Sequence, residues 1–232
     1  MKRRRWTPAR TLKAGATLAT LSYAGYAGFS WLRYGRPKPP SAAEADPLLD
    51  RFIPSYDVVE RHHIRVAAPP AVVLKAAKEQ SLFRSGPVKA IFRARQLVLG
   101  ATGAEGPQAE TLLEEVQALG WRILVDEPGH EIVLGAVTKP WQANVTFRGL
   151  SPEDFRAFAE PGYVKIAWTL RADPIESGGA IFRTETRATA TDRASRARFR
   201  SYWSFASPGI ALIRWLSLLP LKREAERRNA ED

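Results

Sequence analysis

The chain has 232 residues, of which 45% are hydrophobic and 10% aromatic, and it contains no cysteine. This composition excludes a disordered chain, a disulfide framework and a cysteine nucleophile. The formal net charge is +11, but residues 41–192 carry 17 basic and 20 acidic residues. The excess lies in residues 1–40, with nine basic and no acidic residues, and in residues 193–228, with nine basic and two acidic. Because a nucleic-acid binder should carry positive charge on its folded body, we expect no nucleic-acid partner.

The first predicted element is a transmembrane helix over residues 14–33, because residues 14–32 are uncharged. At ~1.5 Å per residue such a helix is about 28 Å long, just enough to cross a bilayer. Six basic residues precede it within residues 1–13, so this basic tail is expected in the cytoplasm and the folded domain outside it. Membrane attachment through residues 14–33 is therefore the expectation.

Other interpretations of this segment remain open, because it is rich in small residues and only modestly hydrophobic. A cleaved signal peptide would leave a secreted domain, and a helix on the membrane surface or a disordered tail would also fit. Ala16, Thr20, Ala24 and Gly28 form a small-residue stripe at spacing four, which suggests a helix–helix partner in the membrane.

Residues 34–49 are predicted to form a proline-rich linker, since Pro37, Pro39 and Pro40 remove backbone donors and favour extended chain. The folded domain is expected over residues 50–228, followed by a tail at 229–232.

Within the domain, apolar periodicity and turn residues predict six strands and several helices. The expected strands are 57–67, 121–125, 131–138, 144–148, 163–171 and 180–191. The expected helices begin at Pro70, Val88, Ala109, after the cap Ser151 and after the cap Asp192. Turns are predicted at Pro128-Gly129 and Gly178-Gly179.

The clearest alternation predicts a strand with one apolar and one polar face. The apolar side comprises Val164, Ile166, Trp168 and Leu170, and the other side comprises Tyr163, Lys165, Ala167, Thr169 and Arg171. The next strand repeats this pattern, with Arg183, Glu185 and Arg187 on its ionic side.

The closing helix is predicted to bend or restart at Ser207-Pro208. Residues 202–221 carry Arg214 as their one charge, so this stretch is compatible with a second membrane span or with a helix buried on the sheet. The buried helix is preferred, because a central Arg costs ~2.5 to 3.5 kcal/mol on membrane insertion.

Several strings carry a family resemblance, namely IRVAAPPAVV, LGW, EPGHEIVLG, KPW, FAEPGYVKIAW, TETRATATD and FRSYWSFASPGIALIR. They resemble a bacterial branch, without a settled function, of the START-like SRPBCC superfamily of polyketide cyclase/dehydrase type. The resemblance covers about residues 50–228. It implies an α+β helix-grip fold, in which a curved antiparallel sheet surrounds a long C-terminal helix and encloses a ligand cavity. Members of the wider fold bind lipids, sterols and polyketides, and a minority are enzymes.

The candidate ligand-binding residues are apolar or aromatic, as expected for such a cavity. They are Trp141, Val164, Ile166, Trp168, Phe182, Tyr202, Trp203 and Phe205. The polar candidates for acid–base chemistry are His130, Glu131, Lys165, Glu185 and Arg187, although a solvated turn histidine with a salt-bridged glutamate and a cross-strand charge ladder are the preferred explanations. No metal site and no cofactor are expected, since His62 and His63 point to opposite faces of a strand.

Three functions are compatible with these features. The preferred one is a membrane-tethered, noncatalytic carrier or sensor of a lipid or other apolar small molecule. The alternatives are a cyclase, dehydratase or hydrolase that uses the same cavity, and an interaction subunit of a membrane assembly.

Overall fold

The computed structural model describes residues 8–81, 85–100, 109–176 and 178–231. One antiparallel sheet in the order β1-β6-β5-β3-β2 forms its centre, and a short β4 pairs with β3. The strands are β1 Val58–Val66, β2 Arg122–Glu127, β3 Glu131–Thr138, β4 Phe147–Arg148, β5 Val164–Pro174 and β6 Ala180–Ala190. All six predicted strands are present, although the one expected over residues 144–148 is reduced to Phe147–Arg148, and Gly129 and Gly178 adopt positive φ at the two predicted turns.

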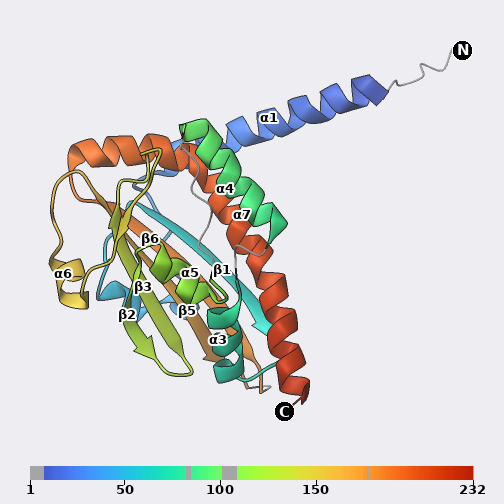
Figure 1. Ribbon diagram of the computed structural model, residues 1–232, viewed down its shortest axis with the longest axis vertical. Helices are drawn as coiled ribbons and strands as arrows, with labels where there is room; N and C mark the ends of the chain where they lie inside the picture. Colours follow the sequence, from blue (N-terminus) through green and yellow to red (C-terminus); the bar gives the residue numbers. More distant parts are fainter. Residues whose placement is uncertain (1–7, 82–84, 101–108, 177, 232) are drawn as a thin grey trace, which may run out of the picture.

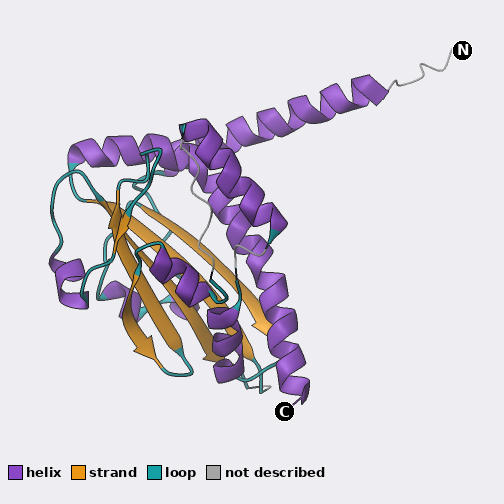
Figure 2. Cartoon of the chain, in the orientation of Figure 1, coloured by secondary structure: helices purple, strands orange, loops and turns teal. Residues whose placement is uncertain are grey.

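The helices are α1 Pro8–Arg33, α2 Pro47–Asp50, α3 Pro70–Glu79, α4 Gly86–Leu99, α5 Leu112–Ala118, α6 Pro152–Ala157 and α7 Arg193–Glu231, with a 3-10 turn at Ala42–Glu44. Helices cover both faces of the sheet, while α1 projects from the body, as Figures 1 and 2 show. The fold is α+β with a curved antiparallel sheet and a long C-terminal helix, as predicted.

The face of the sheet that carries Val164, Ile166, Trp168 and Leu170 is covered by α3, α5 and α7, and we call it the α7 face. Residues of β3, β5 and β6 pack there against Leu218, Leu221 and Ala225 of α7. The first half of α7 packs further along the same face through Phe199 and Trp203.

Helix α7 begins where expected, because the side chain of Asp192 accepts hydrogen bonds from the backbone N–H groups of Ala194 and Ser195. Pro208 and Pro220 lie inside it, and Figure 1 shows that the helix changes direction along its first half. Among the described residues, α7 is the helix that is long and apolar enough to cross a membrane, a property that core helices share.

The opposite face of the sheet, which we call the α2 face, is covered by residues 42–56 and by α6. Leu49 and Ile53 pack there against Val133, Val137 and Phe155. The segment expected as a linker, residues 34–49, follows this face for part of its length: Arg171 donates hydrogen bonds to the carbonyl oxygens of Ala43 and Ala45.

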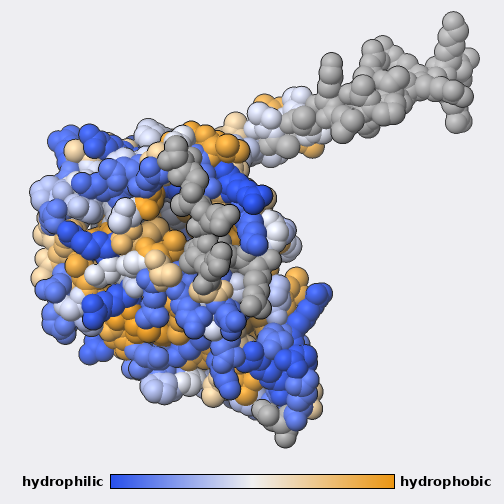
Figure 3. All heavy atoms as spheres, viewed as in Figure 1, coloured by the Kyte–Doolittle hydropathy of each residue, from blue (hydrophilic) through white to orange (hydrophobic). Residues whose placement is uncertain are grey.

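Helix α1 leaves the body at the first half of α7 and projects away from it (Figure 1). Tyr23 packs edge-on against Phe205, and the Ser207 hydroxyl donates a hydrogen bond to the Ser30 hydroxyl. Hydrophobic side chains gather where α1 meets the body (Figure 3). Residues 1–7 of the expected basic tail lie outside the described residues.

Candidate functional site

A small, mainly apolar pocket that contains a few polar groups lies beneath α7, within the apolar α7 face. It has a volume of about 20 Å³, room for one water molecule. The lining residues come from five elements and are Ala77, Gln80, Leu112, Trp168, Leu170, Phe182, Thr184, Arg214, Ser217 and Leu221. No acidic side chain is among them.

Arg214 is the charged group of this pocket. Its guanidinium lies 3.8 Å from the ring centroid of Trp168, a cation–π arrangement, and donates a hydrogen bond of 3.2 Å to the Thr186 hydroxyl. Burial lowers the pKa of the guanidinium to about 9, although the nearby charge of Glu60 opposes this shift. Arg214 therefore remains charged at neutral pH.

The surrounding polar groups are held by the sheet register. Trp168 pairs with Thr186 across β5 and β6, and the indole N–H of Trp168 donates a hydrogen bond of 2.6 Å to Thr184. On the helix side, the Gln80 amide donates to the carbonyl oxygen of Ser217. The Thr184 hydroxyl accepts from Trp168, so its own proton is available to an acceptor in the pocket.

An open groove runs beside this pocket, between the edge strand β1 and the outer side of α7. It has a volume of about 480 Å³. Its lining residues are Arg61, His62, His63, Ile64, Trp215, Leu218 and Leu219. The groove and the pocket are adjacent, because His62 pairs with Thr184 in the sheet and Leu218 follows Ser217 in α7.

Two further ionisable groups lie on β1 beside this groove. The Nε2 atom of His62 is buried and lies 3.5 Å from a carboxylate oxygen of Glu60. In the β1–β6 register Glu60 stands opposite Thr186, the residue that accepts from Arg214. Glu60, His62 and Arg214 thus form a polar patch on an otherwise apolar face.

The structure separates the eight predicted cavity residues into three groups. Trp168 and Phe182 line the pocket beneath α7. Trp141, Val164, Ile166, Tyr202 and Trp203 gather in a second cluster, further along the α7 face, where they pack against one another and Phe199. Phe205 is 39% exposed and packs on Tyr23 of α1, away from the pocket.

None of the five polar candidates lines the pocket beneath α7. His130 is exposed in the β2–β3 turn, 3.3 Å from Glu127 and 3.6 Å from Asp173. Lys165 lies on the α2 face, where it donates to the carbonyl oxygen of Arg156, and burial lowers the pKa of its ammonium group.

Glu131, Glu185 and Arg187 also lie on the α2 face and are buried. Arg187 lies 2.6 Å from Glu185, and Glu185 lies 2.8 Å from Arg61. Of these ion pairs, Arg61–Glu185 crosses between β1 and β6, whereas Glu185 and Arg187 share β6 and Lys165 takes no part, so the predicted ladder of Lys165, Glu185 and Arg187 is not formed as such.

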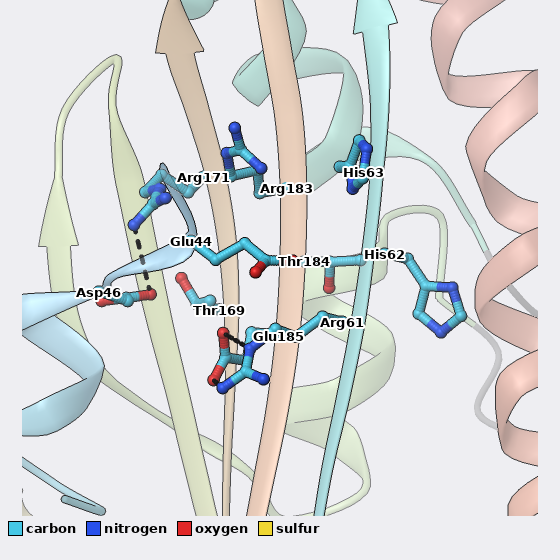
Figure 4. Close-up of a pocket in the computed structure, with 10 residues that line it drawn as sticks. All are labelled: Glu44, Asp46, Arg61, His62, His63, Thr169, Arg171, Arg183, Thr184 and Glu185. Carbon is cyan, nitrogen blue, oxygen red and sulfur yellow. Dashed lines mark hydrogen bonds and ion pairs between the residues drawn. The ribbon is translucent and has the colours of Figure 1, made fainter. Parts of the chain in front are cut away.

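A second small pocket of about 20 Å³ lies on this ionic face (Figure 4). Its charged groups neutralise one another: Arg61 lies 2.8 Å from Glu185 and Arg171 lies 3.9 Å from Asp46, while Arg183 pairs with Asp173 outside the lining. In Figure 4 most of the labelled side chains lie on the α2 face, whereas His62 points toward α7. Because its arginines are paired, this pocket is less suited than the one beneath α7 to a charged ligand.

Within the parts of the chain that the structure describes, no group of three or more His, Asp and Glu side chains could hold an ion.

The sheet order, the antiparallel pairing and the final helix across one face define the helix-grip class of folds. No family model and no curated protein matches this chain. It is similar to the KanY protein (ms6282), solved by NMR, at 15% identity over 73% of this chain and 97% of that one, with a TM-score of 0.33. The Zhui aromatase/cyclase from Streptomyces sp. R1128 shows 14% identity over 74% of this chain and 94% of that one, with a TM-score of 0.22. CalU16 from Micromonospora echinospora shows 14% identity over 75% and 97%, with a TM-score of 0.25. Such scores do not transfer a ligand or a reaction.

Sequence reasoning missed Arg214, Glu60 and His62 as a site. The signal for Arg214 was present, since it is the one charge within residues 202–221. A charge in an apolar helix was interpreted as an argument against membrane insertion, whereas it also marks the point where a buried helix needs a polar partner. The alternation of β1 likewise places Glu60 and His62 on the apolar face.

Proposed function

We propose that this protein is a membrane-tethered binding protein, a carrier or sensor, for a lipid or other largely apolar small molecule. The observation that carries the proposal is the groove between β1 and α7. Its volume of about 480 Å³ falls within the ~300 to 1,000 Å³ of typical small-molecule sites. Ile64, Leu218 and Leu219 supply apolar surface, and Trp215 supplies an aromatic wall that is 60% exposed.

The polar patch supports binding more than catalysis. A reaction requires a proton donor or acceptor within hydrogen-bond reach of the bound molecule. His62 and Glu60 are the nearest such groups, but the Nε2 atom of His62 lies 3.5 Å from a carboxylate oxygen of Glu60, so these polar atoms face each other and not the groove. The groove is also open to solvent, whereas chemistry of the cyclase or dehydratase type favours an enclosed site.

Helix α1 is proposed as the tether. Its described apolar side chains Leu18, Leu21 and Leu32 are 65 to 70% exposed, and apolar surface of this kind favours contact with lipid. The basic residues before it favour a cytoplasmic N-terminus, with the domain outside the cytoplasm. Signal cleavage followed by secretion is the alternative topology, and a partner helix in the membrane is a further proposal.

The binding proposal is tested by native mass spectrometry of the full chain, released from detergent, to detect a copurifying small molecule. Leu219→Trp places an indole in the groove at a position that is 46% exposed, so the fold should tolerate it. We expect bound mass on the parent chain and about tenfold less on this variant. Leu97→Trp on α4, at a position 82% exposed and outside the groove, is the matched control and should retain the ligand. Equal ligand loads on both variants would refute the groove as the site.

A further inference from the structure

We propose that Arg214 is the anchor for an acidic group, so that the ligand is an apolar molecule that carries one oxyanion such as a carboxylate or a phosphate. This inference rests on the proposed binding function and specifies its ligand class. The polar donors beneath α7 and the absence of acidic lining there carry the argument.

The charge of Arg214 has no direct counter-ion. Within the described ranges, no carboxylate lies within ion-pair distance of its guanidinium, and Glu60 acts on it only at longer range. Arg214 is partly buried, so its charge loses part of its hydration without gaining a carboxylate partner, and an anion that enters the pocket offsets that cost. The planar guanidinium has five N–H donors, of which one is used by Thr186, so at least a bidentate contact remains open.

The neighbouring groups favour an anion over a cation or a neutral polar group. The Thr184 hydroxyl has a proton to donate, since its oxygen accepts from the Trp168 indole. Trp168 also holds the guanidinium in place by stacking at 3.8 Å, which fixes the direction of its free N–H groups. Arg214 is the ionisable residue among those that line the pocket, so the pocket offers a positive charge and no negative one.

The volumes of the pocket beneath α7 and of the groove beside it fit a ligand with a small polar head group and a larger apolar part. The pocket of about 20 Å³ holds one water molecule, so a head group reaches Arg214 only when the surrounding side chains move apart, whereas the groove of about 480 Å³ accommodates a chain or ring system. His62 with Thr184 on the sheet side and Leu218 on the helix side form the boundary between them. Entry of the head group then requires a side-chain movement at this boundary.

The test compares 11-(dansylamino)undecanoic acid with its methyl ester on the full chain in lipid nanodiscs, with empty nanodiscs as the blank. We expect the acid to bind the parent chain about tenfold or more tightly than the ester, as a charge-assisted contact predicts. Arg214→Gln should abolish this preference by weakening the acid and leaving the ester unchanged. Arg198→Gln, an exposed arginine on the same helix, should behave as the parent chain.

Further variants keep the test decisive if Arg214→Gln fails to fold. Arg214→Lys keeps the charge and should retain part of the preference for the acid. Glu60→Gln removes the nearest competing carboxylate and should tighten the acid severalfold. Dodecyl phosphate and dodecanoic acid, used as competitors of the probe, distinguish a phosphate head group from a carboxylate.

The outcomes separate the two proposals. Equal binding of acid and ester to the parent chain, or equal weakening of both by Arg214→Gln, would overturn the role of Arg214 while leaving the groove as a binding site. Failure of both probes to bind the parent chain would instead count against the proposed function itself.

Discussion

The buried carboxyl group of Glu131 shows how side-chain direction decides chemistry. In strand β3 it points to the α2 face, where it is 1% exposed and accepts a hydrogen bond of 2.5 Å from the Thr169 hydroxyl. Burial and the nearby carboxylate of Asp46 raise its pKa to about 8 from an ordinary value of 4.5. The protonated acid is therefore the favoured form at neutral pH, held between Thr169 and Asp46.

This raised pKa makes stability depend on pH. Between pH 4.5 and 8 the folded chain holds a proton at Glu131 that the unfolded chain releases, so the free energy of unfolding falls as pH rises through this window. Glu131→Gln removes the titration while preserving the shape of the side chain. Urea denaturation should show the parent chain losing on the order of 2 kcal/mol relative to this variant between pH 6 and pH 9. Parallel pH profiles for the two proteins would contradict the assignment.

At the same scale, sequence periodicity assigned faces correctly but could not identify the site. Alternation placed Val164, Ile166 and Trp168 together on one face, as the structure has them. It could not show that the pocket beneath α7 opens at Trp168, while Val164 and Ile166 pack in another cluster. That outcome depends on how α7 crosses the sheet, since the crossing brings Arg214 over Trp168.

At the scale of elements, the covering of the α2 face was the least predictable feature. The pattern of β5 and β6 predicted an ionic face without indicating what covers it, and the prolines of residues 37–40 predicted an extended linker. Instead, Asp46 caps the short helix α2 by accepting from the backbone N–H of Leu49, and this turn places Leu49 on the sheet. One turn of helix is too short to leave a periodic signal in the sequence.

We expect α2 to contribute strongly to stability because Leu49 is fully buried. Leu49→Ala should lower the free energy of unfolding by about 2 to 5 kcal/mol, through lost burial and the cavity it leaves. Leu48→Ala, next to it but only partly buried, is the matched control and should cost clearly less. Chemical denaturation of both variants measures the difference, and equal costs would show that α2 packs only loosely on the sheet.

At the scale of the whole molecule, the protein consists of a projecting helix, α1, and a folded body, which differ in charge and in exposed apolar surface. Helix α1 projects from a body whose middle region, residues 41–192, is slightly acidic. Helix α7 also exposes apolar side chains, among them Leu212, Trp215 and Leu219. Helices α1 and α7 are therefore two candidate membrane contacts. Altering one of them and measuring membrane attachment shows which of them holds the protein at the membrane.

We expect α1 to be the membrane attachment. Deleting residues 1–22 removes its projecting part and keeps Tyr23 and Ser30, which contact α7. This variant should move from the membrane pellet to the soluble fraction. Leu18→Lys combined with Leu21→Lys, at two exposed positions of the full chain, should weaken attachment, since each central charge costs ~2.5 to 3.5 kcal/mol on insertion.

Fractionation with a carbonate wash distinguishes the remaining arrangements of the parent chain. Resistance to carbonate indicates a spanning α1, whereas extraction indicates a helix on the membrane surface, because a spanning helix is held by its whole apolar length. Intact mass spectrometry that finds the N-terminus missing would establish signal cleavage. If the chain without residues 1–22 stays in the pellet, the exposed residues of α7 must hold it there, and the groove that Trp215 and Leu219 line would then face the bilayer from which its ligand comes.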